Sequence, residues 1–167
     1  LPPQASVALI DASYGWHEAG LAHSHSQLAA HLTGPLVLPV PATGRALEVA
    51  LWLHKLGRSM VLDSGCAGVL HQALTLGDEH FVPGVWKQLQ QLARTVRQGD
   101  RAVQQALAAV RCDQALHTPV LLLADPAPDG RVAPLLAQCL QDGQCTHTVV
   151  FTGYCPTTLL NALSDAQ

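Results

Sequence analysis

The sequence contains no apolar run close to the roughly 18–20 residues that a membrane-spanning helix requires. It also lacks a basic and apolar leader of the kind that directs secretion. Together these absences predict a cytoplasmic protein with no membrane partner. Charged residues are scarce, at 13%, whereas apolar residues make up 49% of the chain. This balance excludes a disordered chain, and a length of 167 residues suits a single domain over residues 1–167.

The cysteines do not form a recognisable pattern. There are five, with no Cys-x-x-Cys pair among them: Cys66, Cys112, Cys139, Cys145 and Cys155. Scattered spacing of this kind favours reduced thiols over a structural zinc site or a disulfide framework. The glycine motifs of dinucleotide sites and of P-loops are absent as well, which argues against a standard dinucleotide or nucleoside-triphosphate site.

A strong positive charge is missing too, because the formal net charge is −3. Proteins that grip nucleic acid by themselves are usually basic, since neutralised phosphates supply most of the non-specific affinity. A nucleic-acid partner would therefore require a local basic patch or a second domain.

What the sequence does contain is an alternation of short apolar runs and longer helical patterns. This order is typical of βα units. It predicts an α/β fold, Rossmann-like, in which helices cover both faces of a mostly parallel sheet of about five strands. The expected strands are residues 6–12, 35–40, 59–63, 119–124 and 149–152, and the expected helices lie near residues 18–32, 45–56, 64–76, 85–98, 100–110, 132–140 and 157–163. Thr43, Ser64 and Asp100 are the expected N-caps of three of these helices.

Each predicted strand is followed by a polar or glycine-containing turn. These turns are Asp11-Ala12-Ser13, Ala42-Thr43-Gly44, Asp63-Ser64-Gly65, Asp125 and Thr152-Gly153. Because parallel strands end at the same edge of a sheet, the five turns are expected to meet there, at helix N-termini, where ligands are often held. Taken singly, each turn is better explained as an ordinary cap or turn, whereas the five together favour a ligand-binding edge.

Residues 39–48, with the sequence PVPATGRALE, resemble the Pro-Val-(Phe)-Ala-x-Gly-Arg-x-x-Glu pattern of the β-CASP domain in metallo-β-lactamase-type nucleases. Three further segments resemble that family in the same order. They are residues 9–15 (LIDASYG), residues 61–64 (VLDS) and residues 149–154 (VVFTGY). Together the four segments extend over nearly the whole chain.

The resemblance implies a cap domain that forms one wall of the substrate cleft in an RNA- or DNA-processing nuclease. Asp11 would be the catalytic residue. The substrate-binding residues would be Ser13, Thr43, Gly44, Arg45, Ser64, Gly153 and Tyr154. No metal is expected within this chain, because the catalytic zinc would belong to a metallo-β-lactamase domain of the same parent protein. The chain, which begins at Leu1 and not at Met, would be one part of that protein and inactive alone.

Several features depart from the family pattern. The His-x-His-x-Asp-His signature is missing, and His23 and His25 imitate only its first half in an expected helix, where we interpret them as a solvated face. Cys155 replaces the glutamine that follows Gly-Tyr. These departures keep open an alternative function, a non-catalytic interaction module with a degenerate β-CASP fold. Arg45 has two roles open as well, since it can bind phosphate or pair with Glu48 three residues later.

Overall fold

A computed structural model describes residues 20–109, 118–124 and 147–152, together with residues 157 and 161. The chain divides into two compact units, Leu1–Ala30 and His31–Gln167. The described part of the first unit is α1 (Leu21–Ala29), a helix that begins after Gly20 without a side-chain cap. Within the described ranges, no helix is both long and apolar enough to cross a membrane.

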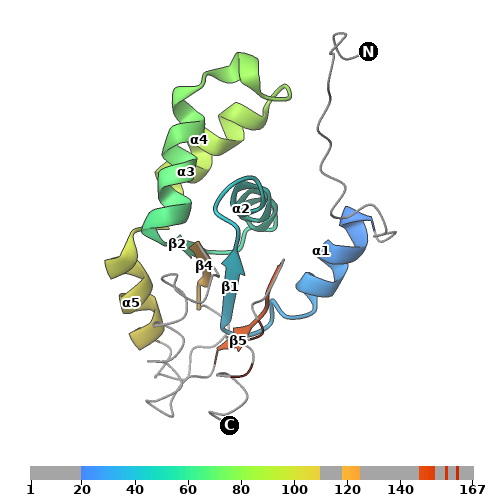
Figure 1. The fold of residues 1–167 in the computed structure, drawn as a ribbon, viewed down its shortest axis with the longest axis vertical. Helices are drawn as coiled ribbons and strands as arrows, with labels where there is room; N and C mark the ends of the chain where they lie inside the picture. The colour runs from blue at the N-terminus through green and yellow to red at the C-terminus, as the bar shows by residue number, and fades with distance from the viewer. Residues whose placement is uncertain (1–19, 110–117, 125–146, 153–156, 158–160, 162–167) are drawn as a thin grey trace. The chain divides into compact units, whose positions relative to one another are not determined.

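The second unit contains a parallel sheet and the helices that connect its strands (Figure 1). Its elements are β1 (Leu36–Val40), α2 (Arg45–Lys55), β2 (Met60–Leu62), α3 (Ser64–Thr75), the 3-10 helix η1 (Asp78–His80), α4 (Val85–Thr95), β3 (Arg97–Gln98), α5 (Asp100–Ala109), β4 (Val120–Ala124) and β5 (Thr148–Val149). The five strands lie in the order β3-β2-β4-β1-β5, and every neighbouring pair is parallel. The predicted α/β class with a Rossmann-like parallel sheet is confirmed.

The central strands are buried on both faces. β1 and β4 read LVLPV and VLLLA, and all ten residues are buried, as expected for strands covered by helices on either side. Val37, Val61 and Leu121 form one cluster with Val103 and Ala106 of α5, so α5 covers that face of the sheet. The alternate strand residues point to the opposite face, where α2 and α3 pack. Figure 1 shows α3 and α4 side by side, with their connection directed away from the sheet.

Pro39 is unusual in a strand that has a neighbour on each side, because proline cannot donate to the hydrogen-bond ladder. In β1 the odd-numbered residues bond toward β5, as shown by the Val150 amide that donates to the Val37 carbonyl at 3.0 Å. Since β5 ends at Val149, the nitrogen of Pro39 faces a position beyond the last paired residue. The proline therefore removes no ladder bond.

The structure differs from the sequence prediction in its edge strands. β3 was not predicted, since Arg97 and Gln98 were assigned to a helical stretch and its end. They form a strand because they pair with Val61 and Leu62 of β2, a contact that local sequence does not encode. The last strand occupies Thr148–Val149 and not residues 149–152. The predicted strand at 6–12 and the helix at 132–140 lie outside the described residues, as does most of the helix at 157–163, of which residues 157 and 161 are helical.

Candidate functional site at the carboxyl edge of the sheet

The carboxyl ends of the strands bring together four of the sequence-predicted site residues. Thr43, Gly44 and Arg45 form the turn between β1 and α2, and Ser64 begins α3 directly after β2. These two turns flank the end of β4, because β4 lies between β1 and β2 in the sheet. The remaining predicted residues, Asp11, Ser13, Gly153 and Tyr154, lie outside the described residues.

The β1–α2 turn is a tight γ-turn centred on Gly44. Gly44 has φ 68° and ψ −73°, and the Arg45 amide donates to the Thr43 carbonyl across it at 2.7 Å. This is the strained form of the γ-turn, which residues with a side chain rarely adopt. Gly44 also occupies the N-cap position, and no side chain caps α2, so the expectation that Thr43 caps this helix is wrong. In this turn the Thr43 carbonyl, and not its hydroxyl, accepts the Arg45 amide.

Replacing Gly44 with alanine should destabilise the protein. A Cβ at this position meets nothing within 4 Å, so the cost is conformational and not steric. We expect a loss of about 1–3 kcal/mol in the free energy of unfolding, measured by urea denaturation. Gly34→Ala is the matched control, because Gly34 has open space and no positive φ. Equal stabilities of the two variants would contradict the assigned turn.

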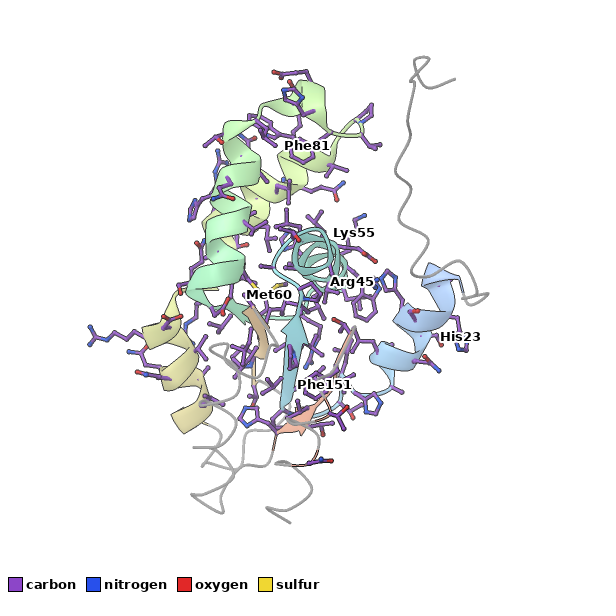
Figure 2. The ribbon with its side chains drawn as sticks, viewed as in Figure 1. His23, Arg45, Lys55, Met60, Phe81 and Phe151 are labelled. Atoms are coloured by element: carbon purple, nitrogen blue, oxygen red, sulfur yellow. The ribbon has the colours of Figure 1, made fainter. Side chains whose placement is uncertain are left out.

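Arg45 lies at the first position of α2, where Figure 2 labels it, with Lys55 at the other end of the helix. Its Nε lies 3.8 Å from Oε2 of Glu48, and each of these side chains is 36% exposed. Of its two proposed roles, the structure therefore shows the ion pair. Surface pairs of this type contribute only about 0–1 kcal/mol, so an incoming anion can compete for the guanidinium. A cation at a helix N-terminus is also unfavourable for the helix dipole, so Arg45 is not explained by helix stability.

The β2–α3 turn is organised by Asp63, which is only 4% exposed. One carboxylate oxygen accepts the Cys66 amide at 2.8 Å, which makes Asp63 the N-cap of α3. The other accepts the Ala124 amide at the end of β4, at 2.9 Å. The sequence prediction assigned the cap to Ser64, which is wrong, and it missed the bond to β4. Asp63 thus joins β2, β4 and α3. Because both of its carboxylate oxygens accept buried amides, the carboxylate is not available to bind a ligand.

Gly65 brings α3 against the end of β4. A Cβ at Gly65 would lie 2.5 Å from the Cβ of Ala124, closer than packed carbon atoms approach. Only glycine therefore fits between the first turn of the helix and the strand end. Gly65 and Asp63 both contact Ala124, so they hold the start of α3 against the end of β4.

Ser64 is turned toward α5. Its amide donates to Oδ1 of Asp100 and its hydroxyl donates to Oδ2, both at 3.1 Å. Asp100 was expected to cap α5, but it is the first residue of that helix, and the Gly99 carbonyl accepts the amides of Ala102 and Val103. The Asp100 carboxylate thus holds the N-terminus of α3, the position where an external anion would otherwise bind.

The segment after β5 approaches the end of β1. The Thr152 hydroxyl donates to the Pro39 carbonyl at 3.4 Å, a long hydrogen bond. It lies on the side of β1 where the proline leaves the ladder open. This contact places the start of the predicted Thr152-Gly153 turn at the same edge as the β1–α2 turn.

Cys66 lies close to this edge, but its thiol is unreactive. Burial raises the pKa of its thiol far above the ordinary range, and the neighbouring Asp63 carboxylate raises it further. Since the thiolate is the nucleophilic form, the thiol is held in its unreactive state. Among the described residues, no three His, Cys, Asp or Glu side chains gather as metal ligands. On α1, His23 is exposed and His25 is partly buried.

Comparison with protein families, with curated proteins and with solved structures found no match for this chain.

Proposed function

We propose that this chain is the substrate-cleft domain of a cytoplasmic, zinc-dependent nuclease of the metallo-β-lactamase type. One observation carries the proposal, namely the geometry of the segment that resembles the β-CASP pattern. Residues 39–48 leave a buried parallel strand, turn at Gly44 and present Arg45 in the first helical turn, partly exposed. A strand-to-helix turn at the carboxyl edge of a parallel sheet is a common place for a phosphate ligand.

In this proposal Arg45 supplies the phosphate contact. A guanidinium binds phosphate oxygens through paired N–H groups, and its weak partner Glu48 yields to a doubly charged or polymeric anion. The γ-turn holds the Arg45 backbone in place, so little ordering is needed on binding. Zinc would be bound by the metallo-β-lactamase domain of the parent protein and would supply the activation of water that phosphodiester hydrolysis requires. Asp11 would face that domain, and the chain alone would not cleave nucleic acid.

Arg45→Ala tests this proposal. The purified chain should bind a fluorescently labelled single-stranded RNA at low salt, and the affinity should fall as salt rises. We expect Arg45→Ala to weaken binding by about tenfold and to reduce the slope of log K against log salt by roughly 1. The measurement is fluorescence anisotropy over a salt series.

Arg94→Ala is the matched control. Arg94 is an exposed arginine in the last turn of α4, so this substitution removes the same charge as Arg45→Ala. If both variants lose affinity equally, binding is non-specific and the assignment of Arg45 fails. If the unaltered chain does not bind at low salt, the proposal as a whole fails.

The second candidate is a non-catalytic interaction module. It is favoured by the Ser64–Asp100 contact, because a carboxylate of the chain itself occupies the N-terminus of α3. The net charge of −3 points in the same direction. Under this alternative the RNA titration shows no binding, and Arg45→Ala changes nothing.

A further inference from the structure

Two exposed arginines lie where the sheet ends at β3. Within the described residues β3 is an edge strand, with β2 as its neighbour. Arg97 is the first residue of β3, and Arg101 is the second residue of α5, which follows it. Both side chains are exposed. The two arginines therefore lie on either side of the short β3–α5 turn.

The two side chains of β3 point to opposite faces of the sheet, as successive strand residues do. Gln98 points to the side of α3 and α4, because its Oε1 lies 2.9 Å from Nε2 of His71 and its Nε2 donates to the Ala93 carbonyl at 3.1 Å. Arg97 points to the side of α5, where its Nη2 donates to Oε1 of Gln105 at 3.2 Å. The Arg97 guanidinium is therefore held against α5.

Gln105 brings the two arginines to the same stretch of α5. Arg101 and Gln105 are four residues apart in this helix, so they are neighbours on its surface. Because Arg97 bonds to Gln105, its guanidinium lies on the same part of the helix as Arg101. The Gln105 oxygen accepts from Arg97, which leaves the amide nitrogen of Gln105 to donate. This surface, formed by Arg97, Arg101 and Gln105, thus presents two cations and an amide donor.

The positive charge of this surface is not neutralised by the described part of the chain. Neither Arg97 nor Arg101 forms an ion pair with a described residue. The nearest carboxylate in the sequence, that of Asp100, accepts the amide and the hydroxyl of Ser64. A cation in the first turn of a helix is unfavourable, and so are two neighbouring cations. Folding stability therefore does not explain the arginine pair, whereas an anionic partner does.

We propose that Arg97, Arg101 and Gln105 form a docking surface for a short acidic peptide segment of a partner protein. Guanidinium groups bind carboxylates through paired N–H groups, and clustered arginines recognise acidic motifs. Charge favours this partner over a nucleic acid. The formal net charge of −3 repels a long polyanion, and two arginines neutralise too few phosphates to hold one. A short acidic segment requires only that its own carboxylates meet the two cations.

This docking surface is separate from the turn that contains Arg45. Arg45 follows β1, whereas Arg97 and Arg101 lie at β3, and β2 and β4 lie between those two strands. The proposed function does not use the docking surface. Either proposal can therefore fail without the other.

Binding of a fluorescently labelled oligo-glutamate peptide, followed by anisotropy at low salt, tests this inference. The purified chain should bind this peptide and should not bind an oligo-glutamine peptide of the same length. We expect Arg97→Gln and Arg101→Gln each to weaken binding by about fivefold, because each removes one exposed ion pair with the peptide. Lys87→Gln is the matched control. It removes an exposed charge at the end of α4 that is farther from β3, and it should leave the affinity unchanged.

A second readout locates the peptide on the unaltered chain. The ¹⁵Nε–¹H resonances of Arg97 and Arg101 should shift on titration with oligo-glutamate, and that of Arg45 should not. The proposal is overturned if the peptide does not bind, if only the Arg45 resonance shifts, or if Lys87→Gln weakens binding as much as Arg101→Gln. It is also overturned, in favour of a nucleic-acid surface, if Arg101→Gln weakens the binding of single-stranded RNA as strongly as that of the peptide.

Discussion

Asp63→Ala should be among the most destabilising single substitutions in the described part of the chain. It removes the N-cap of α3 and leaves two buried amides, those of Cys66 and Ala124, without an acceptor. We expect a loss of about 3–5 kcal/mol in the free energy of unfolding, from the lost cap and the two unsatisfied amides together. For a chain of this size the corresponding drop in Tm is about 10 °C. Guanidinium denaturation followed by circular dichroism measures the change.

Two further variants separate the hydrogen bonds from the charge. Asp63→Asn keeps one acceptor oxygen but directs an amide donor at the second N–H, so its stability should fall between those of the parent and of Asp63→Ala. Asp78→Ala removes an exposed carboxylate in η1 and should change stability by no more than about 0.5 kcal/mol. An Asp63→Ala variant as stable as Asp78→Ala would show that the carboxylate does not join β2 to β4.

Gly65→Ala and Gly68→Ala should have opposite effects although both glycines lie in α3. Alanine normally stabilises a helix by about 0.5–1 kcal/mol over glycine, and Gly68, which has open space around it, should show this gain. At Gly65 the new methyl group meets the Cβ of Ala124, and the strain should give a net loss of about 1–3 kcal/mol. Thermal unfolding of the two variants shows directly whether each substitution raises or lowers the Tm.

The clash at Gly65 also predicts a rescue. Ala124→Gly removes the opposing methyl group, so the double variant Gly65→Ala/Ala124→Gly should recover part of the stability that Gly65→Ala loses. A double variant whose losses simply add would mean that the two residues are not in contact, and the close packing of α3 on β4 would be refuted.

The sequence was informative where a local pattern and a buried position coincide. β1 and β4 were predicted because an uninterrupted apolar run is typical of a central parallel strand, and both are fully buried. β3 was missed because Arg97 and Gln98 carry no apolar pattern, and they form a strand only through their pairing with β2. Propensity cannot detect an element that exists because of its neighbour.

The same limit explains what was and was not foreseen at the site. That the polar turns share one edge follows from the parallel arrangement of the strands, which sequence order predicts. The hydrogen-bond partner of each side chain cannot be predicted in this way, because the partners are far away in the sequence. Asp63 and Ser64 were adjacent candidates in one turn, yet the first binds the amide of Ala124 and the second binds Asp100. Only the three-dimensional arrangement distinguishes a residue that holds the strands from one that faces a helix.

The strand order has a consequence for how the sheet assembles. β4 is the central strand, yet it comes late in the chain, and its contact with Asp63 joins residues 61 positions apart. Until β4 has been synthesised, β1 and β2 have no strand between them and cannot pair with each other in the native order. A chain that has been synthesised past β2 but not as far as β4 therefore has two apolar strand edges uncovered, and non-local closure of this kind is slow. In the native sheet β4 occupies the position between these two edges, and the Asp63 carboxylate accepts the amide at its end.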